Sequence, residues 1–167
     1  MQILAVIPAR FNSTRFPGKP LCRIAGISMV EHCFRRATLA AGVDEVFVAC
    51  CDEEVAEHVR NFGGRAIMTD PQISRPSLRV EAAAQQIPHT KDDIIVVFQG
   101  DEPLIHPNMI DFAVQPLLLD ADLEISNLCA PVDMKDWTDP AEIKVVCDLD
   151  MNAMYMSRAP IPSIDHE

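Results

Sequence analysis

A cationic segment, Pro8–Pro20, contains the first residues whose types and spacing suggest chemistry. It includes Arg10, Arg15 and Lys19, and because no acidic residue precedes Glu31, the first 30 residues are purely cationic. In an otherwise acidic chain, such a segment is typical of a site that grips a small polyanion. Its Asn, Ser, Thr and Gly residues supply hydroxyl and backbone N–H groups that complement Lys and Arg around phosphate oxygens. The segment predicts a phosphate site, with a solvated basic loop as the alternative; no Walker or dinucleotide-binding glycine motif is present.

A second group of residues, Gln99–Pro103, directly follows the strongly apolar run Ile94–Phe98. An acidic side chain at the end of a buried strand can hold Mg²⁺ against the phosphates of a nucleotide. Glycine at position 100 lets the backbone approach a ligand closely. Asp101 and its neighbour Glu102 point in different directions in an extended segment, so Asp101 is the expected metal ligand. A surface turn is the alternative interpretation.

Apolar runs bounded by turn residues alternate with helical stretches over the first two thirds of the chain. The expected strands are Ile3–Ile7, Val46–Cys50, Ala66–Met68 and Ile94–Phe98, and the expected helices are Ser28–Ala41, Glu53–Phe62, Leu78–Gln86 and Asn108–Leu119. This alternation predicts a three-layer α/β/α fold with a mostly parallel sheet. The cationic segment and Gln99–Pro103 then lie at the carboxyl edge of the sheet, where open α/β folds bind ligands. Ile94–Phe98 is the most β-branched run and is expected in the middle of the sheet.

Several residues are expected to end or shape these elements. Asp52 is placed to cap the helix that begins at Glu53, and Gly42, Gly63 and Gly64 are placed to end helices in the left-handed conformation. Pro116 is expected to bend or shorten its helix. Three further strands are expected in the last third of the chain: Glu124–Pro131, Ile143–Cys147 and Met154–Ser157. They predict an antiparallel addition that makes the sheet mixed.

The composition bounds the class of protein. With 167 residues, 49% of them hydrophobic, the chain is long enough for one domain with a substantial core, and we expect residues 1–167 to form a single domain. The net charge of −11 argues against nucleic acid as a partner. No run reaches the roughly 20 apolar residues of a membrane span, so we expect a cytoplasmic protein without a membrane partner. The six cysteines predict reduced, mostly core-packed thiols, with a disulfide or zinc site as the alternative.

Two long motifs, Ile7–Leu21 and Gln99–Ile105, resemble those of the 3-deoxy-manno-octulosonate (KDO) cytidylyltransferases, or CMP-KDO synthetases. The similarity continues through Ile143–Val146 and Met154–Pro162 and so covers nearly the whole chain. It implies a Rossmann-like nucleotidyltransferase fold and transfer of CMP from CTP to KDO, with release of pyrophosphate, for lipopolysaccharide synthesis. It also implies Mg²⁺ as cofactor and a homodimer as the assembly. The family extends past Glu167, so the resemblance implies a C-terminally incomplete nucleotidyltransferase domain.

The same resemblance implies roles for individual residues. Ala9 and Arg10 would lie at the cytosine and phosphate end of CTP, and Arg15 and Lys19 would follow the triphosphate. Arg79 would bind the nucleotide on the base side, Gln99 would lie near the nucleotide or the sugar, and Arg158 would face the sugar acid. Asp101 would bind Mg²⁺. Lys19 and Asp101 are therefore the expected catalytic residues, which act by positioning phosphates and neutralising their charge rather than as nucleophiles.

The sequence departs from the family pattern next to Arg79 and before Ile143. Arg75–Arg79 stands where the family has Ser-Gly-Thr-Asp/Glu-Arg, which predicts an altered base-side pocket, and Ala141 replaces an Asn. Two alternatives stay open: transfer to a related acidic sugar, such as an amino-KDO or a nonulosonic acid, and a non-catalytic remnant that binds nucleotide or a partner chain.

Overall fold

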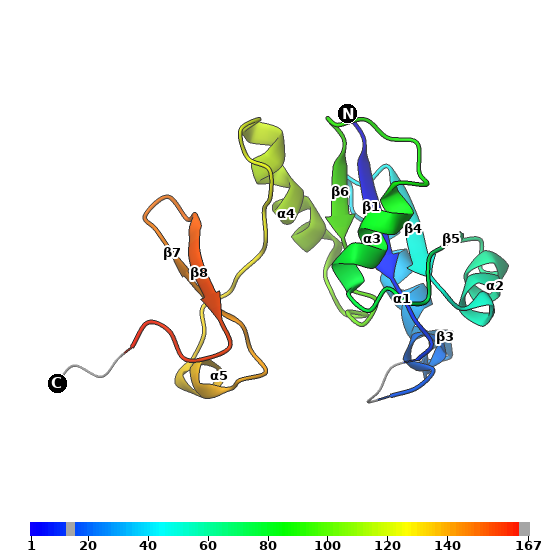
Figure 1. Ribbon diagram of the computed structural model, residues 1–167, viewed down its shortest axis with the longest axis horizontal. Helices are drawn as coiled ribbons and strands as arrows, with labels where there is room; N and C mark the ends of the chain where they lie inside the picture. Colours follow the sequence, from blue (N-terminus) through cyan, green and yellow to red (C-terminus); the bar gives the residue numbers. More distant parts are fainter. Residues whose placement is uncertain (13–15, 164–167) are drawn as a thin grey trace. The chain divides into compact units, whose positions relative to one another are not determined.

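The computed structural model describes residues 1–12 and 16–163, and these form two compact units, Met1–Ser126 and Asn127–Glu167. The first unit contains a four-stranded parallel sheet in the order β5-β4-β1-β6 (Figure 1). Its strands are β1 (Ile3–Pro8), β4 (Glu45–Cys50), β5 (Arg65–Met68) and β6 (Ile94–Val97). The four predicted strands of the parallel half are thus confirmed. The prediction of one domain over residues 1–167 stays a prediction, and each unit is described by itself.

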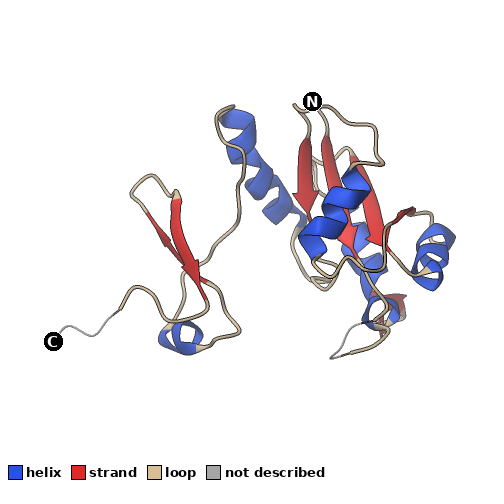
Figure 2. Cartoon of the chain, in the orientation of Figure 1, coloured by secondary structure: helices blue, strands red, loops and turns tan. Residues whose placement is uncertain are grey.

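Strand β1 pairs with β4 on one side and with β6 on the other, and both of its faces are buried. Ala5 and Ile7 join one apolar cluster, whereas Leu4 and Val6 join another. The first cluster includes side chains of α1 (Met29–Thr38), α2 (Glu53–Asn61) and α4 (Pro107–Leu119), and the second includes side chains of α3 (Pro76–Ala84). Since successive side chains of a strand point to opposite faces, helices cover both sides of the sheet (Figure 2). The three-layer α/β/α fold is confirmed.

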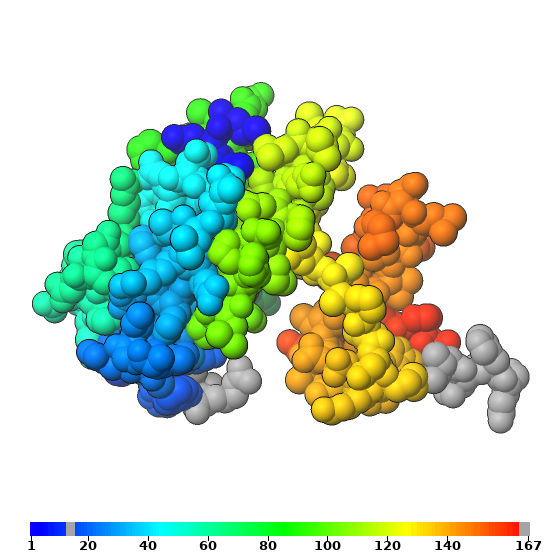
Figure 3. All heavy atoms as spheres, turned by 180° about the vertical axis from the view of Figure 1, so that it is seen from behind, coloured from blue at the N-terminus to red at the C-terminus, as the bar shows by residue number. Residues whose placement is uncertain are grey.

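Helix α1 packs against α4 on one side of the sheet, and the two lie together in the space-filling view (Figure 3). The N-cap of α1 is Ser28, whose Oγ accepts a hydrogen bond from the Glu31 N–H. Helix α4 runs through Pro116 to Leu119, so the proline does not shorten it.

Two of the predicted helix ends are wrong. Asp52 occupies the N-cap position of α2, yet its side chain accepts no hydrogen bond from that helix and binds the Phe11 N–H instead. Gly42 is not left-handed, because the Asp111 carboxylate accepts from its N–H and holds the chain after α1 in another conformation. Gly63, by contrast, has a φ of 87° and ends α2 as predicted, whereas Gly64 after it is not left-handed.

The position predicted for the run Ile94–Phe98 is also wrong. Among the described strands, β6 pairs only with β1 and forms an edge of the sheet. The chain adds β4 and β5 on one side of β1 and then returns to its other side, which leaves β1 in the middle. Val97, at the end of β6, is 46% exposed, in keeping with an edge.

The remaining elements are small. The first unit also contains the 3₁₀ helix η1 (Lys19–Leu21) and a short hairpin of β2 (Arg23–Ile24) and β3 (Ile27–Ser28). The second unit contains α5 (Met134–Thr138) and an antiparallel pair of β7 (Lys144–Cys147) and β8 (Ala153–Ser157). The last two predicted strands are confirmed, but they form a sheet of their own.

The predicted strand Glu124–Pro131 is wrong. The segment is irregular and lacks a paired strand in the part of the chain that the structure describes. Ile125 is 84% exposed, so the apolar residues of the segment do not cover a core. Across the described ranges, no helix combines the length and the apolar character that crossing a membrane requires.

Candidate active site

The strand order places a ligand-binding position between β1 and β6. The connection after β1 leads toward β4, whereas β6 lies on the other side of β1, so the strand order reverses there. Because β1 and β6 are parallel and in register, with Val6 opposite Val97, their carboxyl ends lie side by side. Open α/β sheets bind ligands just outside the carboxyl ends of strands at such a reversal.

A hollow of about 210 Å³ opens at this position. It contains five of the predicted site residues: Ala9, Arg10, Lys19, Gln99 and Asp101. Pro8, Pro20, Pro76 and Gly100 complete its lining. The cationic segment after β1 and the acidic turn after β6 therefore lie around one space, as the sequence predicted.

Lys19 and Asp101 form an ion pair in this hollow. The Lys19 Nζ donates to Asp101 Oδ2 at 2.5 Å, although 82 residues separate the two in sequence. Their side chains are 30% and 46% exposed, so both remain accessible to a ligand. An exposed pair of this kind contributes only about 0–1 kcal/mol to stability. Fold stability therefore gives little reason for this cation and this carboxylate to lie together.

A glycine lies next to each partner of this ion pair and lets the two backbone segments come close together. Gly18, with a φ of 71°, precedes η1, and its N–H donates to the Phe11 carbonyl at 2.8 Å. On the other side, a Cβ atom at Gly100 would lie 2.6 Å from the Pro8 carbonyl oxygen. Only glycine permits this approach without a shift of one backbone, so Gly100 sets how close the two segments come.

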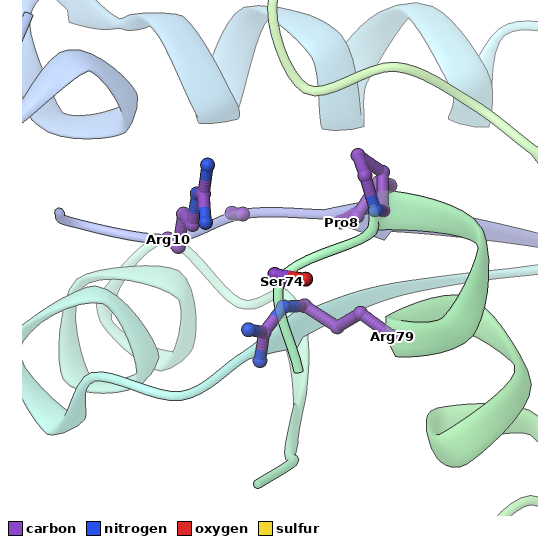
Figure 4. A pocket seen from close by; sticks show the side chains of 6 residues that line it. Pro8, Arg10, Ser74 and Arg79 are labelled. Carbon is purple, nitrogen blue, oxygen red and sulfur yellow. The ribbon is translucent and has the colours of Figure 1, made fainter. Parts of the chain in front are cut away.

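A smaller hollow of about 50 Å³ adjoins the same segment and is lined by Ser74, Pro76 and Arg79 together with residues 8–10. Figure 4 shows Arg79 extending from α3 toward the loop that carries Ser74. Arg79 is only 2% exposed, and its guanidinium donates to the Thr69 hydroxyl and to the Ile73 carbonyl, the latter at 2.6 Å. No carboxylate forms an ion pair with Arg79 within the described ranges. The positive charge of Arg79 is therefore buried without a negative charge to balance it, which favours an electron-rich ligand nearby.

The thiols next to the site are neutral and packed rather than reactive. Burial raises the pKa of Cys33 and of Cys50 to about 11. Burial and the bond to Asp52 also raise the pKa of Cys51, whose Sγ donates to Asp52 Oδ2 at 3.3 Å. All six cysteines are free thiols. The raised pKa values keep these three thiols protonated, so they are poor nucleophiles.

Two further predicted site residues, Arg15 and Arg158, lie outside the described part of the first unit. Arg15 lies outside the described residues. Arg158 belongs to the second unit, where its Nη1 donates to the carbonyls of Pro140 and Ala141 at 3.0 and 2.7 Å. Lys144, 2% exposed, donates to the flanking carbonyls of Asp139 and Glu142 at 2.7 and 2.8 Å. Four successive carbonyl groups are thus occupied by two cationic side chains, which fix this loop.

Sequence reasoning assigned no individual role to four residues around the hollows, although the first two bound the predicted cationic segment: Pro8, Pro20, Ser74 and Pro76. Pro76 was visible only as part of the departure at Arg75–Arg79. Pro76 stands at the first position of α3, where its fixed φ suits a helix start. The start of α3 borders both hollows, so Pro76 lines both. The described residues contain no group of three or more His, Cys, Asp or Glu that could hold a metal ion.

An α/β sheet with a cationic segment and a carboxylate side by side at its strand reversal is typical of the α/β proteins that bind a small anionic ligand there. The sequence profile of the cytidylyltransferase family matches residues 4–167, and the chain belongs to this family.

Individual relatives agree with this assignment. The chain is 46% identical over 164 residues to the 3-deoxy-manno-octulosonate cytidylyltransferase of Geobacter metallireducens, covering 98% of this chain and 63% of that protein. It is 40% identical over 168 residues to the 8-amino-3,8-dideoxy-manno-octulosonate cytidylyltransferase of Shewanella woodyi, covering 97% of this chain and 67% of the relative. A solved structure of CMP:2-keto-3-deoxy-manno-octonic acid synthetase complexed with CTP matches with a TM-score of 0.93 and 37% identity, over 98% of this chain and 67% of the other. The chain thus spans about two thirds of the length of these relatives.

Proposed function

We propose that the protein is a cytidylyltransferase that transfers CMP from CTP to KDO, giving CMP-KDO and pyrophosphate for lipopolysaccharide synthesis in the cytoplasm. The observation that carries this proposal is the ion pair of Lys19 and Asp101 inside a hollow that also contains Arg10 and Gln99. A triphosphate needs cationic side chains along its oxygens and, with a metal ion, a carboxylate that holds the metal. The family and its relatives support CTP as the nucleotide.

Asp101 suits Mg²⁺ as the cofactor. Mg²⁺ keeps several waters and is commonly held by one or two carboxylates together with substrate phosphates, so a complete protein cage is not needed. The Asp101 carboxylate is 46% exposed and lines the hollow, which leaves room for such ligands. When bound, Mg²⁺ would neutralise phosphate charge during the transfer.

The residues of this chain position the reactants. The anomeric hydroxyl of KDO attacks the α-phosphorus of CTP and gives up its proton to water, the bond from the α-phosphorus to the oxygen of the β-phosphate breaks, and pyrophosphate leaves with the electron pair of that bond. No covalent intermediate on a side chain is required, so orientation and charge neutralisation supply most of the rate. Arg10 and Lys19 neutralise phosphate oxygens, while the Gln99 amide donates to nucleotide or sugar. Arg79 lies on the base side with Ser74 and Ala9.

Arg158 is proposed to bind the carboxylate of the sugar acid. Both N–H groups of its Nη1 already donate to carbonyls of residues 140 and 141. A guanidinium has five N–H donors, so the edge formed by Nε and Nη2 remains for a carboxylate, which it can bind through two parallel hydrogen bonds. The loop carbonyls would then fix the direction of that edge.

The acceptor sugar is chosen between two close candidates. Relatives of 46% and 40% identity are named for KDO and for its 8-amino derivative, respectively. We propose KDO because the relative of higher identity acts on it by name, and we keep the 8-amino sugar as the second candidate. A homodimer is proposed as the assembly, with no nucleic acid or membrane partner.

The experiment is isothermal titration with CTP and Mg²⁺, followed by measurement of pyrophosphate release with KDO, the 8-amino sugar or a nonulosonic acid as acceptor. We expect CTP to bind in preference to ATP and GTP, and KDO to give the fastest release. Binding of CTP without release for any acceptor would favour the nucleotide-binding remnant. Absence of CTP binding would overturn the proposal.

A further inference from the structure

Asp52 stands where a helix cap is expected but makes a different bond. At the N-cap of α2, an Asp side chain normally accepts from one of the first helix amides and stabilises the helix. Here the backbone has the N-cap conformation, with φ −114° and ψ 123°, yet the carboxylate accepts nothing from α2. Its Oδ2 instead accepts from the Phe11 N–H at 2.7 Å. The helix therefore forgoes a side-chain cap in favour of a contact with residues 41 positions away in sequence.

The contact fixes the backbone of the cationic segment. Phe11 is held on both sides, because its N–H donates to Asp52 and its carbonyl accepts from the Gly18 N–H at 2.8 Å. Two residues earlier, the Ala9 N–H donates to the Ala49 carbonyl at 2.8 Å. The backbone that carries Arg10 is thus anchored before and after that residue, and the anchor at Phe11 continues to Gly18, directly before Lys19.

We propose that Asp52 is a positioning residue for nucleotide binding: its carboxylate holds the Phe11 N–H and thereby sets the direction of Arg10 and, through the hydrogen bond from the Gly18 N–H to the Phe11 carbonyl, that of Lys19. This inference rests on the proposed function. Asp52 lines neither hollow, so it acts through Phe11 rather than on the ligand. A carboxylate is suited to this bond, since hydrogen bonds to a charged acceptor are stronger than those between neutral groups.

Three variants separate positioning from helix stability. In Asp52→Ser the side chain is a good helix cap but too short to reach Phe11, so we expect an unchanged or higher melting temperature and a Kd for CTP with Mg²⁺ raised about tenfold. Asp52→Asn keeps an acceptor of the same length, and we expect it to restore the Kd to within about threefold of the wild type. Ser28→Ala is the matched control for helix stability: it removes the N-cap bond of α1 and the contact of the Ser28 hydroxyl with His58 of α2, but leaves the bond between Asp52 and Phe11, so it lowers the melting temperature and leaves the Kd unchanged.

Hydrogen exchange of the Phe11 amide tests the anchor without nucleotide. We expect this amide to be protected in the wild type and in Asp52→Asn, and to exchange about tenfold faster in Asp52→Ser. Unchanged exchange in Asp52→Ser would overturn the inference. So would a Kd that follows the melting temperature across all three variants. If the wild type binds no CTP while Phe11 loses protection in Asp52→Ser, the anchor stands and the proposed function fails.

Discussion

Replacing Asp101 should have opposite effects on nucleotide binding with and without Mg²⁺. The carboxylate pairs with Lys19 at 2.5 Å and would also repel a triphosphate. Two unit charges about 4 Å apart interact by about 1 kcal/mol in water and about 4 kcal/mol at an effective dielectric constant of about 20. The side chains of Lys19 and Asp101 are 30% and 46% exposed, so water screens the charges in the hollow. The repulsion between the Asp101 carboxylate and a phosphate charge therefore lies toward the lower of these energies, at about 1–2 kcal/mol. Asp101→Asn should therefore tighten metal-free CTP binding by roughly tenfold.

With Mg²⁺ the sign should reverse, because the variant lacks the proposed metal ligand. We expect Mg²⁺ to strengthen CTP binding by the wild type and to have little effect on Asp101→Asn. Lys19→Met should weaken binding by roughly tenfold in both conditions, because it removes the cation that we propose to contact phosphate. Neither change should lower the free energy of unfolding by more than about 1 kcal/mol.

The assay is calorimetric titration of CTP in Mg²⁺ or in EDTA, with urea unfolding of each variant in parallel. Glu45→Gln is the control, since it removes a surface ion pair with Arg65 at the amino end of β4, away from the hollow. The reasoning would be refuted if Asp101→Asn weakened CTP binding equally in Mg²⁺ and in EDTA. An effect of Glu45→Gln as large as that of Asp101→Asn would refute it as well.

Three further outcomes are expected. Gly100→Ala should lower the free energy of unfolding by about 1–3 kcal/mol in urea titrations, because its Cβ meets the Pro8 carbonyl at 2.6 Å; unchanged stability would contradict this. Backbone N–H bonds lower the pKa of Asp93 below 3.8, so its contribution to stability is present above 3.8 and is lost as pH falls through the folded-state pKa. The melting temperature of Asp93→Asn should therefore fall less at acid pH than that of the wild type. The same fall in both proteins would contradict this prediction. In alkylation mapped by mass spectrometry, exposed Cys129 should react first and buried Cys33 only on unfolding, whereas equal rates would be inconsistent with the structure.

The parallel half of the fold was predictable because its signals are local. Each strand of that half is a short apolar run between turn residues, and each helix has a polar or glycine boundary. The edge position of β6 was not predictable from its composition. A β-branched run indicates burial by helices above and below, whereas the order of strands depends on the direction of each crossover connection.

The errors at Asp52 and at Glu124–Pro131 have a shared cause. A capping rule considers the residues next to the helix, but the Phe11 N–H competes for Asp52 from 41 positions away. An extended apolar pattern likewise becomes a strand only where another strand offers hydrogen bonds, and none is paired with residues 124–131 in the described part of the chain. Long-range partners decided both cases.

The candidate site was predictable in part. Position after a strand, together with charge, indicated Lys19 and Asp101 separately, and the family resemblance joined them. Ser74 and Pro76 escaped notice because nothing in their types indicates a ligand; their place beside the hollow follows from where α3 begins. The roles of all the predicted site residues toward a ligand, Lys19 and Asp101 included, stay predictions.

The most direct test asks whether the segments after β1 and after β6 respond to one nucleotide. Backbone amide resonances of Ala9, Arg10, Lys19, Gln99 and Asp101 should be followed by NMR during titration with CTP and Mg²⁺. We expect all five to shift along curves that fit a single Kd. Shifts confined to one of the two segments, or curves with separate dissociation constants, would contradict a shared nucleotide site.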